Sequence, residues 1–398
     1  SNFSHPVLSH ATLKASYSLT ADRGPAFVTN SQTILNSYSP WRPSASVTES
    51  GMRITELENS ELTYEKKHEF NVGVDLGFLH NRINLAADYY RRNNFDLIGV
   101  INTQGAGGTI AKYANIASMR SSGIELTLST QNIKKKGFSW NTDFIFSKTK
   151  NEITDLKSHA NVLDLISGNG FGREGYPVRA LFSIPFAGLT EDGLPTFINQ
   201  DGQRTISTLN FQEYEKLGFL KYEGPTDPTI TGSFGNILTY KNFKLNVFLT
   251  YSFGNVIRLD PVFSSAYSDL DAMPKEFKNR WMKAGDENTT NIPTIVSYRM
   301  NQQYAYLNMA YNAYNYSDVR IADGGFIRLK EISLSYDLPA KVLNFFRLNK
   351  LQFKIQATNL FLLYADSKLN GQDPEFFRSG GVSTPVPRQF TFTIRLGL

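Results

Sequence analysis

The residues best suited to recognise a ligand are tyrosines in one polar stretch, residues 302–316. The stretch reads QQYAYLNMAYNAYNY, and its tyrosines alternate with Asn308, Asn312 and Asn315. Aromatic faces beside amide groups suit the binding of a sugar or a peptide, and tyrosine-rich surfaces also suit protein contacts. The alternative is a loop that packs on itself and on the neighbouring structure. The residues for which we predict contact roles are Tyr304, Tyr306, Tyr311, Tyr314 and Tyr316.

Residues of the catalytic type lack the spacing that catalysis or metal binding needs. The 5 histidines are isolated, with no H-x-x-x-H pair and no cysteine, which favours turn or surface roles. The acidic pieces 226–228, 269–271 and 373–375 lack the spaced carboxylates of a calcium loop, which favours turns. We predict no catalytic residue, no metal site and no cofactor, and therefore a protein that is not an enzyme.

The clearest structural element is a hairpin of two long strands within residues 232–255. Its second run alternates apolar and polar residues from Phe243 to Phe253, with Phe248 as the exception. Such a run exceeds the about five or six residues of a soluble strand. It matches the roughly 9–11 residues that a tilted strand needs to cross a bilayer. The hairpin therefore predicts part of a transmembrane β-barrel wall.

The same alternation recurs along the chain and predicts about twelve strands. Two of them are expected at 178–189 and 196–199, joined by a short turn at 191–193. Short turns alternate with long loops, as outer-membrane barrels alternate periplasmic turns with extracellular loops. The predicted fold class is all-β, an antiparallel transmembrane β-barrel with extracellular loops and a periplasmic C-terminus.

Two strands near the end of the chain carry further signals. In the strand over 327–338 the apolar residues change from odd-numbered to even-numbered positions near Lys330 and Glu331. This change predicts a β-bulge. The alternative is that the upper part of this strand stands above the membrane. The last strand alternates from Phe390 to Leu398 and resembles the terminal strand that outer-membrane assembly machinery recognises.

Composition excludes several other classes of protein. The 398 residues contain no apolar run long enough for a transmembrane helix and no cysteine for disulfides or thiolate metal sites. The net charge of +5 is small, and its cations are scattered apart from 134–136, so we predict no nucleic-acid partner. No signal-peptide pattern follows Ser1, and we expect a fragment of a longer chain.

Several segments in fixed order resemble the C-terminal half of the SusC/RagA-type TonB-dependent transporters of Bacteroidota outer membranes. The similarity covers nearly all of the chain from about Asn59 onward. The segments that carry it include NSELTYEKKHEFNVGVDLGFLHNRINLAADYYRRNNFDLI, EGYPVRALFSIPFAGLTEDGLP, GPTDPTITGSFGNILTYKNFKLNVFLTYSFGN, DGGFIRLKEISLSYDLP and PRQFTFTIRLGL.

The resemblance implies a 22-stranded barrel with an N-terminal plug, a TonB-contacting segment and a SusD-like surface lipoprotein as a lid. About ten strands, the plug and the TonB segment have no counterpart, so residues 1–398 are expected to be the C-terminal part of the barrel. The implied location is the outer membrane of a Bacteroidota-type Gram-negative bacterium. The implied partners are the bilayer, TonB, the lipoprotein and a second SusCD-type pair in a dimer. The five tyrosines then become candidates for lipoprotein contact as well as ligand contact.

The function implied by the resemblance is import of oligosaccharides or oligopeptides. Loops and lid would capture the ligand, and energy coupled through TonB would displace the plug. The alternatives are a passive porin or structural outer-membrane barrel, and a soluble β-sandwich that binds glycans. Neither explains the alternating loop lengths together with the terminal strand.

Overall fold

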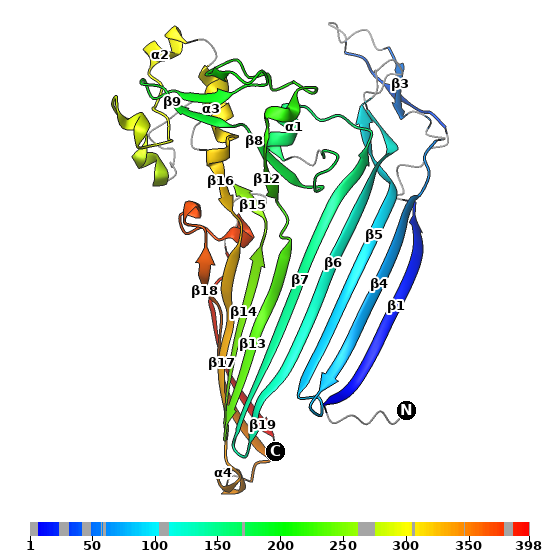
Figure 1. Cartoon of the computed structure of the whole chain (residues 1–398), viewed down its shortest axis with the longest axis vertical. Coiled ribbons are helices and arrows are strands. Elements are labelled where there is room, and N and C mark those ends of the chain that lie inside the picture. Colours follow the sequence, from blue (N-terminus) through cyan, green and yellow to red (C-terminus); the bar gives the residue numbers. More distant parts are fainter. Residues whose placement is uncertain are drawn as a thin grey trace.

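A curved wall of antiparallel strands dominates the computed structural model (Figure 1). The structure describes residues 7–23, 32–41, 49–56, 58, 61–102, 111–168, 172–261, 275–304, 307–345, 347–377 and 385–397. In these residues the wall contains ten strands in the order β1-β4-β5-β6-β7-β13-β14-β17-β18-β19. Its two outermost strands, β1 and β19, are each paired on one side, so the described residues form an open wall.

The wall strands are long, and none of them contains a proline that would interrupt the pairing. They range from 9 residues in β19 to 25 in β6. Their bounds are Leu8–Asp22 (β1), Glu65–Phe78 (β4), Ile83–Asn102 (β5), Ala111–Lys135 (β6), Phe138–Leu156 (β7), Ile230–Tyr240 (β13), Phe243–Phe253 (β14), Phe326–Asp337 (β17), Lys350–Ala365 (β18) and Gln389–Gly397 (β19).

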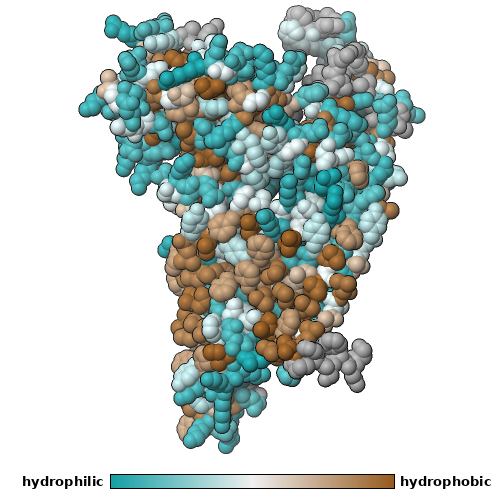
Figure 2. Space-filling model, viewed as in Figure 1, coloured by the Kyte–Doolittle hydropathy of each residue, from teal (hydrophilic) through white to brown (hydrophobic). Residues whose placement is uncertain are grey.

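The wall has one apolar and one polar face. Residues paired across two strands share a face, so Phe234 and Leu249 lie on the apolar face while Ser233 and Thr250 lie on the polar face. Many large side chains on the apolar face are exposed, including Phe390 at 73%. Figure 2 shows apolar residues gathered in a band on the lower half of the wall, with hydrophilic residues at both ends. This pattern is that of a membrane barrel wall and confirms the predicted fold class.

The strands predicted at 178–189 and 196–199 lie outside the wall. They form β8 (Ala180–Ser183), β9 (Phe186–Leu189) and β10 (Pro195–Ile198), which pair in small separate sheets. The prediction of about twelve wall strands was therefore wrong, and the described wall has ten. The turn at 191–193 is not a wall turn either. Because the two misplaced segments follow one another, removing both leaves the alternation of short and long wall connections unchanged.

A folded body, here called the cap, stands at the loop end of the wall (Figure 1). It comprises the described residues of the two connections 157–229 and 254–325. No helix in the described part of the chain is long and apolar enough to span a membrane. The remaining cap elements are α1 (Val162–Ser167), β11 (Arg204–Thr205), β12 (Lys221–Pro225), β15 (Val256–Arg258), α2 (Tyr298–Gln303), α3 (Leu307–Asn315), β16 (Ile321–Asp323) and 3₁₀ turns at Leu217–Phe219 (η1), Lys275–Asn279 (η2), Asp286–Asn288 (η3) and Asp318–Arg320 (η4).

Both connections contribute to a single hydrophobic core in the cap. Phe182, Leu194 and Phe197 from the first connection pack with Leu307 and Tyr314 from the second, and all five are almost fully buried. A parallel bridge between Ile184 and Ser317 also joins the two connections. The two long loops therefore fold as one body.

The remaining elements lie at the two ends of the wall. The hairpin of β2 (Ile34–Tyr38) and β3 (Gly51–Glu56) and the 3₁₀ turns Ser367–Leu369 (η5) and Pro374–Phe376 (η6) belong to the other long connections. Helix α4 (Ala340–Phe345) lies at the opposite end, in the connection from β17 to β18.

The predicted bulge in β17 is confirmed at Lys330. Phe248 pairs with Glu331 and Leu249 with Leu329, which leaves Lys330 as an extra residue that restores the apolar parity. The pairing with β18 shifts at the same level, where Asn359 adopts a positive φ of 54°. Asn tolerates this left-handed conformation better than most residues.

We expect Asn359→Val to destabilise the folded wall by about 1–2 kcal/mol, because a β-branched side chain is strained at positive φ. Asn359→Gly is the matched control and should leave stability near that of the wild type. Thermal unfolding of the full-length protein in detergent micelles measures both effects. A Gly variant as unstable as the Val variant would show that the amide side chain, not the backbone, matters here.

Candidate binding site at the loop end of the wall

Several charged side chains on the polar face of the wall have partners on neighbouring strands. Asp75 forms an ion pair with Lys14, and Asp143 accepts a hydrogen bond from Ser129 at 2.7 Å. Glu69 lies 3.1 Å from the Arg92 guanidinium. The face is thus hydrophilic but largely self-satisfied, and such a surface can line a path for water and polar solutes.

A second polar group on this face centres on Glu331, directly beside the bulge. Its carboxylate accepts hydrogen bonds from Asn246 and Ser333, each at 3.1 Å. Lys354 lies 3.8 Å from it and donates to Gln356 at 2.7 Å. Since the bulge changes the direction of β17 at Lys330, it places this carboxylate on the polar face.

A hollow of about 560 Å³ lies where the polar face meets the cap. Its volume falls within the range of ligand pockets. Hydroxyl, amide and guanidinium groups alternate in its lining with apolar side chains, a combination that suits reversible binding of part of a polar oligomer. The lining includes Ser167, Leu181, Thr231, Ser252, Asn255, Arg258, Phe326, Glu375 and Phe377.

A buried arginine fastens one edge of this hollow. Nη2 of Arg328 donates to both carboxylate oxygens of Asp373, at 2.6 and 2.7 Å, and lies 3.0 Å from Glu375. The guanidinium also stands 5.3 Å from the ring centre of Phe326. Side-chain exposure is only 5% for Arg328 and 8% for Asp373. The ion pair therefore ties the connection between β18 and β19 to strand β17.

The opposite edge is held by Arg258, which comes from β15. Its Nη2 donates to the carbonyl oxygen of Phe182 at 2.5 Å. The guanidinium lies 5.3 Å from the ring centre of Tyr316. These contacts join the two connections of the cap, because Phe182 comes from the first and Arg258 and Tyr316 come from the second.

The structure disperses the five tyrosines that the sequence singled out. Tyr311 and Tyr314 are buried in the cap core, at 9% and 1% exposure, and burial raises the pKa of Tyr314 to about 12. Tyr304 is half-buried, with its hydroxyl 3.4 Å from Asp192. Tyr316 is half-buried under Arg258, and Tyr306 lies outside the described residues. The contact role stays a prediction, while packing is the observed role of Tyr311 and Tyr314.

Residues 307–315 of this stretch form helix α3 rather than an irregular loop. The residues that α3 buries are Leu307, Ala310, Tyr311, Ala313 and Tyr314. Most of them follow the i, i+3, i+4, i+7 spacing of a helix face, which was present in the sequence. The helical spacing of these apolar residues was the signal in the sequence that could have predicted a helix packed against a core.

The piece 373–375, predicted as a turn, is confirmed as one. Asp373 is the N-cap of η6 and accepts a hydrogen bond from the backbone N–H of Glu375 at 3.1 Å. Its partner Arg328, 45 residues away, was missed. No spacing rule connects two residues so far apart.

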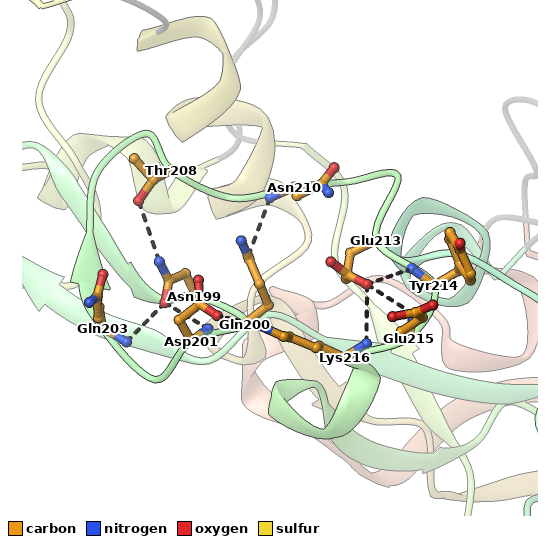
Figure 3. Close-up of polar contacts among 10 residues, drawn as sticks. All are labelled: Asn199, Gln200, Asp201, Gln203, Thr208, Asn210, Glu213, Tyr214, Glu215 and Lys216. Carbon is orange, nitrogen blue, oxygen red and sulfur yellow. Dashed lines mark hydrogen bonds and ion pairs between the residues drawn. The ribbon is translucent and has the colours of Figure 1, made fainter.

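Side-chain caps organise the cap loop 199–216, which Figure 3 shows. Asn199 accepts hydrogen bonds from the backbone N–H groups of Asp201 and Gln203 at 3.1 and 2.9 Å. Glu213 accepts from three successive backbone N–H groups at its C-terminal side, at 2.9 to 3.1 Å. Lys216 pairs with Asp201 at 2.7 Å and closes the loop. This loop is held by local bonds.

Curated proteins similar to this chain are TonB-dependent receptors, although no protein-family profile matches it. TonB-dependent receptor P3 of Formosa agariphila is 25% identical over 348 residues, covering 82% of this chain and 32% of the relative. TonB-dependent receptor SusC of Bacteroides thetaiotaomicron is 26% identical over 363 residues, covering 85% and 32%. The chain thus spans about a third of the length of these relatives.

Solved structures share the fold over the whole chain. The RagAB peptide transporter matches with a TM-score of 0.74 at 21% identity, covering 99% of this chain and 41% of that one. The RagAB peptide importer in its closed-closed state matches with a TM-score of 0.74 at 22% identity. This match covers 100% of this chain and 42% of that one.

The chain is thus similar to part of the TonB-dependent receptors and shares the fold of the matching part of the RagAB transporter. Within that class, these matches confirm the predicted resemblance to the SusC/RagA type.

We expect Arg328→Met to weaken the edge of the hollow, because it leaves the Asp373 carboxylate buried without a cation. Removing one partner of a buried ion pair costs about 3–5 kcal/mol. Hydrogen exchange of backbone amides in 366–377 should therefore accelerate in the full-length protein. The double variant Arg328→Met/Asp373→Leu removes both charges and should regain much of the protection. Unchanged exchange in the single variant would contradict a fastening role for the ion pair.

We expect the loop 199–216 to lose protease resistance as the pH falls from about 5 to about 3. The backbone N–H groups of Glu215 and Lys216 hold the pKa of Glu213 below the usual carboxyl range. A lowered folded pKa stabilises the loop above the unfolded pKa, and this is lost as the pH drops through the folded value. Glu213→Ala should be cleaved faster at neutral pH and show a weaker pH dependence. Glu215→Gln is the control and should behave like the wild type.

Proposed function

We propose that the chain forms the C-terminal part of the barrel of an outer-membrane importer powered through TonB. The observation that carries the proposal is the open wall with an apolar and a polar face, matched over its whole length by SusC/RagA-type structures. The remaining strands, a plug and the TonB-contacting segment would come from the rest of the protein. We propose that the barrel is oriented in the outer membrane with the cap and the long loops on the extracellular side and the C-terminus on the periplasmic side.

The solute class best suited to the polar face is an oligosaccharide or an oligopeptide. Glu331, Lys354 and the lining of the hollow present alternating acceptors and donors, which suit hydroxyl and amide groups of an oligomer. The solved relatives are named as a peptide transporter, which supports the peptide arm. The polar groups act by reversible hydrogen bonding, so import requires no covalent step.

A SusD-like lipoprotein is the proposed lid over the cap. The cap has its own buried core, and a surface that is folded before binding suits docking of a second protein. Of the five tyrosines, Tyr304, Tyr306 and Tyr316 stay proposed for lipoprotein or ligand contact, since Tyr311 and Tyr314 are buried. Two pairs, each of one barrel and one lipoprotein, would form the dimer.

We expect a large side chain in the hollow to block import without disturbing the barrel. Thr231→Trp fills the polar-face hollow, whereas Ile230→Trp adds the same ring to the apolar face one residue earlier. Uptake of labelled oligopeptides and oligosaccharides is measured in cells that express the full-length protein. Uptake should fall at least about tenfold for Thr231→Trp, as expected when a bound solute loses roughly 1.4 kcal/mol. It should stay near the wild type for Ile230→Trp.

Dependence on TonB separates the proposal from its alternatives. An importer loses uptake when TonB is deleted and when the lipoprotein is deleted. Uptake that persists without TonB would establish a passive porin. Release of the protein from membranes without detergent would establish a soluble sandwich.

A further inference from the structure

A group of cations lies on the apolar side of the wall, at the loop end of strands β5, β6 and β7. Arg91 pairs with Ser122 of β6, and Ser122 pairs with Lys150 of β7. One row lower, Tyr89, Ile124 and Lys148 are paired in the same way. One row higher, Asn93 and Glu152 flank Arg120. Arg91, Arg120, Lys148 and Lys150 thus occupy three successive rows of one surface, here called the basic patch.

Register fixes the face on which the patch lies. Paired residues share a face, and the next rows down are Leu126 with Phe146 and Leu128 with Phe144, which are apolar. All four cations of the patch are exposed. Hydrophilic residues cover the wall between the apolar band and the cap (Figure 2). The patch therefore stands directly above the surface that hydrocarbon would cover.

The patch has more positive charge than the protein neutralises. Its one carboxylate is Glu152, which lies 3.5 Å from Lys150. Arg120 donates to the neutral Asn93 side chain at 3.4 Å. Among the ion pairs of the described residues, none includes Arg91 or Lys148. By contrast, Arg92 on the polar face of β5 forms an ion pair with Glu69.

Unneutralised cations next to the apolar band suit an anion from outside the chain. The four cations repel one another across adjacent rows, and a phosphate group relieves that repulsion. Arginine binds phosphate with two parallel hydrogen bonds, and clusters of Lys and Arg beside a membrane recognise anionic lipid headgroups. Tyr89, with 39% of its surface exposed, lies at the same level, where aromatic side chains anchor to the interface.

We propose that the basic patch binds the phosphate groups of a lipopolysaccharide-type lipid in the leaflet at the loop end of the wall. Its acyl chains would lie along the apolar rows below, from Phe146 to Phe144, and its phosphates would contact Arg91, Lys148 and Lys150. The inference rests on the proposed orientation, which makes the loop end extracellular. A lipid bound at the patch would stay associated with the outer surface of the barrel.

The test measures retention of phosphorylated lipid A by the purified full-length protein in detergent, using native mass spectrometry. The variant Arg91→Gln/Arg120→Gln/Lys148→Gln/Lys150→Gln removes the four charges of the patch and keeps a polar side chain at each position. The matched control Lys134→Gln/Lys135→Gln/Lys136→Gln/Lys241→Gln removes the same number of charges at the short-turn end. We expect affinity to fall on the order of a hundredfold in the patch variant and to stay unchanged in the control.

Lipid chemistry provides the second comparison. Dephosphorylated lipid A should be retained as weakly by the wild type as phosphorylated lipid A is by the patch variant. Phosphatidylglycerol that competes equally would overturn the assignment to lipopolysaccharide. Equal losses in both variants would overturn the site, because they would show a general effect of charge. Migration of unheated and heated samples in electrophoresis establishes that each variant is folded.

The two proposals fail separately. Import that depends on TonB in a protein that retains no phosphorylated lipid overturns the basic patch alone. Retention of the lipid by a protein that imports without TonB overturns the proposed function alone.

Discussion

Everything in this fold depends on the pairing of backbone groups across strands. In hydrocarbon an unpaired N–H or C=O group is not satisfied by water, so a wall must form a continuous ladder. Strand β13 meets this requirement along its whole length, because residues 230–240 pair with β7 on one side and β14 on the other. The bulge at Lys330 adjusts which side chains face hydrocarbon while pairing continues above and below it.

The sequence predicted the wall because its signal is local. The alternation of apolar and polar residues along Phe243–Phe253 predicts both the strand and its two faces. The change from odd-numbered to even-numbered apolar positions near Lys330 predicts the bulge. Even the exception, Phe248, has a local explanation. It lies on the polar face opposite Gly235, where a β-carbon would be 3.3 Å from its ring, so the missing side chain leaves room for the ring. Period two does not say which sheet a strand joins, and for this reason 178–189 was assigned to the wall.

The cap and the edge of the hollow could not be predicted in the same way. Tyr311 and Tyr314 have the composition of a binding surface, yet the helical period of their neighbours puts them inside a core. The pair of Arg328 and Asp373 joins distant parts of the chain, and only the assembled wall brings them together. Local patterns therefore defined the scaffold, whereas contacts between loops defined the candidate site.

The shared core of the cap has a consequence for how the sequence can change. Side chains from the two connections around β13 and β14 fill one interior, so a larger residue at Phe182 or Leu194 must be matched by a smaller one on α3. Insertions in one loop alter the surface that the other must cover. We therefore expect substitutions in the two loops to be coupled, so that a change in one loop is compensated in the other.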